Sequence, residues 1–206
     1  FIAHGTNNFL NDYIDFSRGI DTADYFRARY GVHPLVQNFW TKKQEFRWFA
    51  ISGALAIAAG IYALFYTNFS ISVLIAFIFG ILVLLFYTWP LKHIALGEFF
   101  IFLVWGPVLV ASVFLVLTKG DMTYFWPVAL AGIPWGLSVV SINLGKHVDK
   151  APEDKVRKVG TLPVVLGEKA GRYLNIAVIA LIYIVILLLV FVTRFFTPVL
   201  LIVLLA

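Results

Sequence analysis

Five long apolar stretches constrain the fold of this chain more than any other feature of its sequence. Each is about as long as the ~20 residues that a helix needs to cross the hydrocarbon core of a bilayer. The stretches cover Trp48–Tyr66, Ile71–Trp89, Gly97–Leu117, Thr123–Leu144 and Tyr173–Val192. We therefore expect an all-α protein that forms a polytopic bundle of transmembrane helices.

The composition argues against a soluble domain of this length. Of the 206 residues, 61% are apolar and 13% are charged, whereas roughly a quarter of the residues in a soluble domain are charged. The basic residues are not interleaved with aromatic residues in a polar setting, so we expect no nucleic-acid partner. The chain has no cysteine, which excludes disulfides and thiolate metal sites. We expect an integral membrane protein that is surrounded largely by the lipid bilayer.

Both ends of the chain look like interrupted helices. Residues 1–10 are too few to span a bilayer and too polar to face lipid, so we expect them to be the last turns of a helix that faces a protein cavity. Thr197 and Pro198 predict a helix start, with threonine as N-cap and proline at the first helical position. We therefore interpret residues 1–206 as one membrane domain, truncated at both ends.

The polar connections divide the basic residues unequally between the two sides of the membrane. If every apolar stretch crosses once, residues 11–47, 90–96 and 145–172 lie on one side and hold 14 of the 16 lysines and arginines. Only Lys119 and Arg194 fall on the other side. By the positive-inside rule the first side is cytoplasmic. We predict a prokaryotic cell-membrane protein with polar catalytic loops at about 11–45 and 145–172 on that side.

Two clusters of acidic residues occur in these two loops. Asp12, Asp15 and Asp21 lie within ten residues, and the segment Asp149–Asp154 holds three more acids. Carboxylates near lipid are costly unless they are hydrated, paired or bound to a cation. Mg²⁺ prefers oxygen ligands and commonly completes its shell with substrate phosphates. Basic residues near the acids are candidates for binding diphosphate oxygens: Arg18, Lys92, Lys146, Lys150 and Arg157.

These segments resemble the motifs of a known family. The run Asn11–Asp15 with Asp21 resembles the first aspartate-rich motif of the UbiA-type intramembrane prenyltransferases. The segment Asp149–Asp154 with the trailing Gly160–Gly167 resembles their second motif, and Tyr87–Lys92 is similar to the segment between them. Within the family, the chain looks most like the 1,4-dihydroxy-2-naphthoate polyprenyltransferases of menaquinone synthesis.

The resemblance implies an enzyme that transfers a polyprenyl group from polyprenyl diphosphate to an aromatic acceptor within the membrane, with Mg²⁺ as cofactor. It implies catalytic roles for Asp12, Asp15, Asp149 and Asp154. The implied metal ligands are these four aspartates and Asn11. The implied diphosphate-binding residues are Asn11, Arg18, Tyr87, Lys92, Lys146, Lys150 and Arg157.

The second motif departs from the family pattern. The family usually places its two aspartates four residues apart, whereas Asp149 and Asp154 are five apart. Either a residue is inserted, or Glu153 substitutes for one aspartate. Pro152 suits the first turn of a helix, which would leave Asp149 just before that helix and Glu153 inside it.

Several alternatives remain open from the sequence. The acceptor could instead be hydroxybenzoate, homogentisate, a chlorophyllide, haem or a lipid alcohol. A cation-coupled transporter would place ionisable groups near mid-membrane, and the apolar stretches hold almost none. Glu98 could bind the acceptor or orient a base, or simply interact with a helix dipole. The four histidines share no metal-ligand spacing, so we expect no zinc.

Overall fold

A computed structural model describes residues 1–193 and 195–205, and every regular element among them is helical. The order is α1 (Ile2–Ser17), α2 (Phe26–Arg29), α3 (Lys42–Tyr66), α4 (Ile71–Phe86), η1 (Leu91–Ile94), α5 (Gly97–Leu103), η2 (Val104–Val108), α6 (Leu109–Leu117), α7 (Phe125–Ala131), α8 (Ile133–Val156), α9 (Leu162–Leu166), α10 (Glu168–Phe191) and η3 (Pro198–Leu205). Among these residues, four helical stretches are long and apolar enough to cross a membrane: Lys42–Tyr66, Gly97–Leu117, Phe125–Val156 and Glu168–Phe191. The remaining predicted stretch, Ile71–Trp89, forms the shorter apolar helix α4, which ends at Phe86. The structure confirms the expected all-α bundle.

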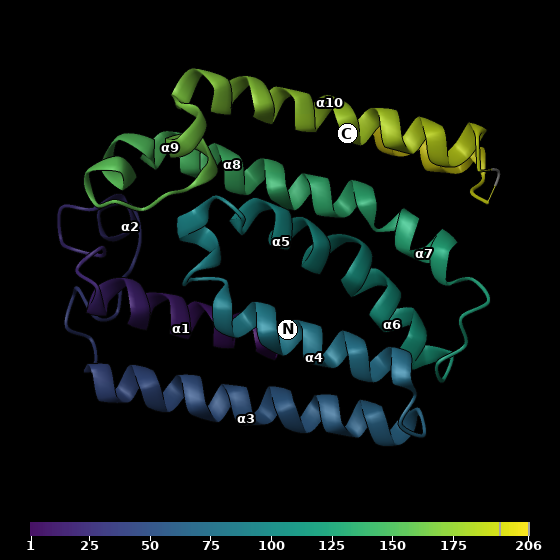
Figure 1. The fold of residues 1–206 in the computed structure, drawn as a ribbon, viewed down its shortest axis with the longest axis horizontal. Helices are drawn as coiled ribbons and strands as arrows, with labels where there is room; N and C mark the ends of the chain where they lie inside the picture. The colour runs from purple at the N-terminus through teal and green to yellow at the C-terminus, as the bar shows by residue number, and fades with distance from the viewer. Residues whose placement is uncertain (194, 206) are drawn as a thin grey trace.

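The long helices run side by side, and the polar segments gather at one end of the bundle (Figure 1). α1 packs against α3, while α8 packs against α5, α9 and α10. The end of α1, the connection between α4 and α5, and the end of α8 all lie at the left of Figure 1, beside α2 and α9. The short turns after α3 and α6 lie at the opposite end. This arrangement brings the two acidic segments to the same end of the molecule.

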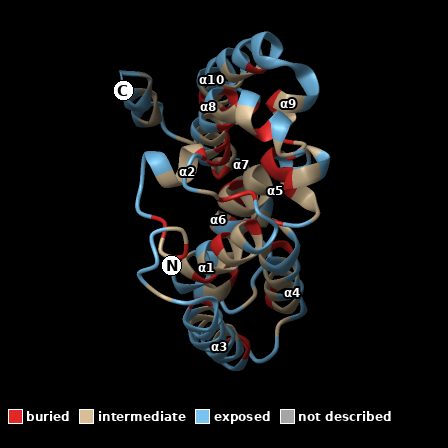
Figure 2. Cartoon of the chain, turned by 90° about the vertical axis from the view of Figure 1, so that its left-hand side faces the viewer, coloured by how far each residue is buried: buried red, intermediate tan, exposed pale blue. Residues whose placement is uncertain are grey.

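The outer faces of the bundle are exposed and apolar, as Figure 2 shows most clearly for α3. Only Glu45 and Leu64 of the 25 residues in α3 are buried, although the helix consists mostly of apolar residues. Exposed apolar helix faces of this extent are expected where lipid, rather than water, covers the surface.

Several helix boundaries differ from those predicted by the sequence. α1 does not stop near residue 10 but continues through Asp12 and Asp15 to Ser17. α3 begins at Lys42 rather than Trp48, because Thr41 and Gln44 form a capping box that starts the helix earlier. The chain from Pro198 is a 3₁₀ helix, η3. Arg194, assigned above to the less basic side, lies outside the described residues.

The prediction that Pro152 begins a helix is wrong. α8 runs without a break from Ile133 to Val156, with Pro152 inside it. Proline removes one backbone hydrogen bond from a helix interior. The packing of α8 against α5, α9 and α10 keeps the following residues helical, so Asp149 and Asp154 belong to the same helix.

Three glycines allow two kinked helices to cross at backbone contact. η2 contains Gly106 in a non-helical conformation followed by Pro107, and Gly132 separates α7 from α8. A Cβ atom built on Gly136 would lie 2.8 Å from the Gly106 Cα and 2.8 Å from the Phe102 carbonyl oxygen. Because the neighbouring atoms belong to backbone, they cannot move aside without separating the helices.

We predict that Gly136→Ala lowers the free energy of unfolding by about 1–3 kcal/mol, the usual cost of overpacking an interior. The measurement is thermal unfolding of the purified protein in detergent. Gly80→Ala is the matched control, because Gly80 is also helical and has no atom within 4 Å of its added Cβ. Equal unfolding temperatures for the two variants would contradict the proposed close crossing.

Candidate functional site

The site at the polar end of the bundle begins with a buried ion pair between α1 and η1. The Lys92 Nζ lies 2.5 Å from the Asp15 Oδ2. Lys92 also donates to the Asn11 Oδ1 at 3.4 Å, and the Thr88 hydroxyl donates to the same oxygen at 3.3 Å. Asp15 is 3% exposed, and its second oxygen, Oδ1, is buried without a hydrogen-bond partner. A buried carboxylate oxygen with free lone pairs can accept a cation.

A second group of ligand atoms lies beside this pair. One ligand atom each from Asp12, Asp21 and His33 lies within 4.8 Å of the others, and all three residues are buried. Arg27 donates to Asp12 at 3.1 Å, and the His33 Nε2 lies 2.9 Å from the Asp21 Oδ2. α1 supplies Asp12, and the loop that follows it supplies Asp21 and His33. Two carboxylate oxygens and an imidazole nitrogen at this spacing could hold a divalent cation.

His33 is held in place by the carboxylates around it. Burial by itself lowers the pKa of His33, but the hydrogen bond with Asp21 and the negative charges of Asp12 and Asp21 act in the opposite direction, and the pKa is raised overall. The carboxylates of Asp12 and Asp21 therefore favour the protonated form of His33.

The second acidic segment meets the first through Tyr25. The Tyr25 hydroxyl donates to the Asp154 Oδ1 at 2.5 Å, and the Thr161 hydroxyl donates to Oδ2 at 3.4 Å. Asp154 is 0% exposed. Burial, followed by the charge of Asp154, raises the pKa of Tyr25, so the phenol stays protonated and can donate. Lys150 donates to the Tyr25 oxygen at 3.3 Å.

Further contacts join the loop after α1 to the end of α8. The Phe26 backbone N–H donates to Glu153 at 2.7 Å, and Arg29 forms an ion pair with the same carboxylate. Arg157 donates to the Ile20 carbonyl oxygen at 3.1 Å and to the Thr22 hydroxyl at 3.0 Å. The two segments are therefore in direct contact although they are more than a hundred residues apart.

The structure does not bring all predicted site residues into this cluster. Asp149 and Lys146 lie on exposed positions of α8. Arg18 is exposed, and its guanidinium carbon stacks 3.5 Å from the Trp89 ring centroid. Tyr87 is half-buried and caps the C-terminal end of α4. The residues that meet at the cluster or contact its members are Asn11, Asp12, Asp15, Lys92, Lys150, Asp154 and Arg157.

Two buried residues of the cluster were missed by the reasoning from sequence. Tyr25 and His33 lie outside the long helices, on either side of the short helix α2, so no periodicity relates them to the aspartates. His33 shares no motif spacing with Asp12 or Asp21 and becomes their neighbour only through the path of the loop. No signal in a single sequence would have identified this pairing.

A buried Glu98–His147 pair lies between α5 and α8. The His147 Nδ1 lies 2.6 Å from the Glu98 Oε1 and 3.4 Å from the Asn143 amide nitrogen. Both members of the pair are buried. Of the roles left open for Glu98, the helix dipole alone does not describe its surroundings, because its carboxylate has a specific partner on another helix.

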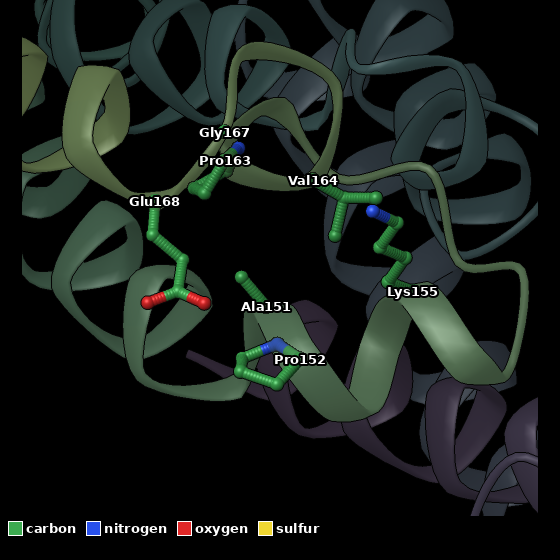
Figure 3. Close-up of a pocket in the computed structure, with 7 residues that line it drawn as sticks. All are labelled: Ala151, Pro152, Lys155, Pro163, Val164, Gly167 and Glu168. Carbon is green, nitrogen blue, oxygen red and sulfur yellow. The ribbon is translucent and has the colours of Figure 1, made fainter.

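A small pocket shown in Figure 3 lies between α8, α9 and the start of α10. It is lined by Ala151, Pro152, Lys155, Pro163, Val164, Gly167 and Glu168. None of these residues belongs to the acidic cluster. The pocket is therefore separate from the acidic cluster.

Comparison with known proteins places the chain within one family. The model of the UbiA prenyltransferase family matches residues 1–206. The 1,4-dihydroxy-2-naphthoate octaprenyltransferase of Bacillus subtilis (strain 168) is 28% identical over 184 residues. That match covers 86% of this chain and 55% of the relative, so the chain spans about half of the relative's length. No solved structure matches the chain.

We predict that Tyr25→Phe loosens the contact between the loop and α8, because it leaves Asp154 buried with one hydrogen bond fewer. The expected loss in unfolding free energy is about 1–3 kcal/mol, the cost of a buried group left unsatisfied. Trypsin should cleave after Arg27 and Arg29 faster in this variant. Tyr30→Phe is the control, because Tyr30 is 73% exposed. Equal cleavage rates in the two variants would show that the hydrogen bond from Tyr25 to Asp154 does not hold this segment against α8.

Proposed function

The chain belongs to the UbiA prenyltransferase family, and from this premise we propose that it transfers a polyprenyl group from a polyprenyl diphosphate to an aromatic acceptor within the membrane. The observation that carries the proposal is the free, buried Oδ1 of Asp15. It lies at the polar end of an apolar helical bundle, beside an ion pair with Lys92. Lys92 already pairs with Oδ2, so Oδ1 is the oxygen left to bind a divalent cation, and such an ion would also neutralise a diphosphate.

The residues present fit a divalent metal ion, and we propose Mg²⁺. Asp12, Asp15 and Asp21 would supply carboxylate oxygens, and Asn11 an amide oxygen. His33 would orient Asp21 through their hydrogen bond. Family members generally use a divalent metal, and an all-oxygen set favours a hard ion such as Mg²⁺. When bound, the ion would neutralise charge on the departing diphosphate.

Basic side chains of the chain would hold the diphosphate itself. Lys92 is buried beside Asp15, Lys150 lies against Tyr25, and Arg157 contacts the loop after α1. In the reaction the bond between the allylic carbon and the diphosphate oxygen breaks, and the diphosphate keeps the electron pair. Positive groups already positioned around that oxygen stabilise the developing negative charge without reorganising. Arg18 and Lys146 lie on exposed positions and would attract the diphosphate electrostatically rather than bind it directly.

The apolar bundle would protect the allylic cation from water until the acceptor ring attacks it. The exposed apolar surface of the helices suits a polyprenyl chain that reaches the site from the bilayer. The relative from Bacillus subtilis is named for 1,4-dihydroxy-2-naphthoate. We propose the same acceptor here, which would place the reaction in menaquinone synthesis.

We predict that Asp15→Asn lowers the rate of prenyl transfer by about 10²–10³-fold, the usual effect of losing one preorganised electrostatic contact at the transition state. The assay uses full-length protein in membranes with labelled polyprenyl diphosphate and a panel of aromatic acceptors. Asp121→Asn is the control, because Asp121 is exposed in the turn after α6. Wild-type turnover by Asp15→Asn, or full activity after exhaustive chelation, would refute the metal site.

The proposed cytoplasmic location of the site can be tested separately, because the chain has no native cysteine. Lys155→Cys places a thiol near the site, and Met122→Cys places one in the turn after α6; both positions are exposed. We predict that an impermeant maleimide labels Met122→Cys in intact cells and labels Lys155→Cys only after the membrane is opened. The reverse pattern would overturn the predicted orientation.

A further inference from the structure

The continuous path of α8 determines which residues can share a face with Asp154. The residue one turn earlier, at i−4, is Lys150. Asp149 lies five residues earlier, about 140° away around the helix at roughly 100° per residue. Asp149 is exposed, and it makes no hydrogen bond or ion pair with the residues that the structure describes. Of the two aspartates in the second segment, only Asp154 therefore reaches the cluster, and Lys150 takes the position one turn before it.

The acids of α8 that do face the cluster have their oxygens occupied. Both oxygens of Asp154 accept hydrogen bonds, from Tyr25 and from Thr161. Both oxygens of Glu153 are also engaged, by the Phe26 backbone N–H and by Arg29. Asp15 differs from them, because one of its oxygens is buried and free. The acidic side chains that α8 places at the cluster therefore do not fit a metal ion of their own.

Lys150 is a cation whose charge lacks a direct partner. It is half-buried and lies 3.3 Å from the neutral Tyr25 hydroxyl and 5.5 Å from the centroid of the same ring. It takes part in none of the ion pairs formed by residues 1–193 and 195–205. An ammonium group has three donors, so Lys150 can still donate to an anion that enters between α1 and α8.

We propose that the site is asymmetric. The half formed by α1 and the segment after it, with Asp12, Asp15 and Asp21, binds a single divalent ion. In the half formed by α8, the Lys150 ammonium takes the place of a second ion in binding the diphosphate. This inference rests on the proposed function and names how its substrate is held. Tyr25 lies in the segment that follows α1 and links it to α8, because its oxygen contacts both Asp154 and Lys150. Lys150 is thus a diphosphate-binding residue, and Asp149 is not a metal ligand.

The test counts metal ions on the full-length protein in nanodiscs, with Mn²⁺ as the metal and inorganic pyrophosphate as the anion. Wild-type protein should bind one Mn²⁺ per chain. Lys150→Asp should bind two and show the spin–spin broadening of a Mn²⁺ pair. Lys155→Asp makes the same charge change on an exposed position of α8 and should still bind one. Two ions on wild-type protein, or one ion on a folded Lys150→Asp variant, would overturn the proposal.

A second measurement covers the case in which Lys150→Asp fails to fold. Lys150→Ala should keep one Mn²⁺ and weaken pyrophosphate binding by about tenfold or more, the effect of losing a hydrogen bond to a charged group, while Lys155→Ala leaves it unchanged. Equal pyrophosphate affinity in the two alanine variants would overturn the proposal. Neither measurement requires prenyl transfer. An inactive protein that still shows these results would refute the proposed function and leave the asymmetric site intact.

Discussion

The buried ion pair between Asp15 and Lys92 is the interaction on which the polar end of the bundle depends. Removing two charges from water is costly unless geometry and additional hydrogen bonds compensate for it. Here Asn11 accepts from Lys92 and from Thr88, so the pair is embedded in a small network. That network joins α1 to η1 and holds one carboxylate oxygen free beside the Asp12–Asp21–His33 group.

The rest of the fold positions this network and keeps lipid away from it. Kinks at Gly106 and Gly132 let α5–α6 and α7–α8 cross at backbone contact, which brings α8 into the centre of the bundle. α8 then extends beyond the apolar stretch to Val156 and carries Lys150 and Asp154 to the loop after α1. Tyr25 completes the junction. The buried charged groups therefore depend on the close packing of the small residues, because they meet only if the helices approach closely.

The two acidic segments, similar in the sequence, have different surroundings in the structure. The aspartates of α1 and its following loop include a free oxygen and a group with metal-ligand spacing. Glu153 and Asp154 of α8 are satisfied by hydroxyl, amide and guanidinium donors. Burial alone does not separate the two, since Asp15 and Asp154 are both fully enclosed. The difference is that hydrogen-bond donors of the protein occupy both oxygens of Asp154 but leave the Oδ1 of Asp15 free.

The sequence by itself determined that the chain is a membrane-spanning helical bundle, because runs of about 20 apolar residues have no other stable environment. Its motifs also indicated the family, which the match over residues 1–206 shows. The sequence could not place Tyr25 and His33, which reach the aspartates only through the path of the segment that connects α1 to α3. Nor could it settle the second motif, where Pro152 suggested a helix start. Only the tertiary packing of α8 keeps that segment helical, and the helix then turns Asp149 outward and Lys150 toward Tyr25.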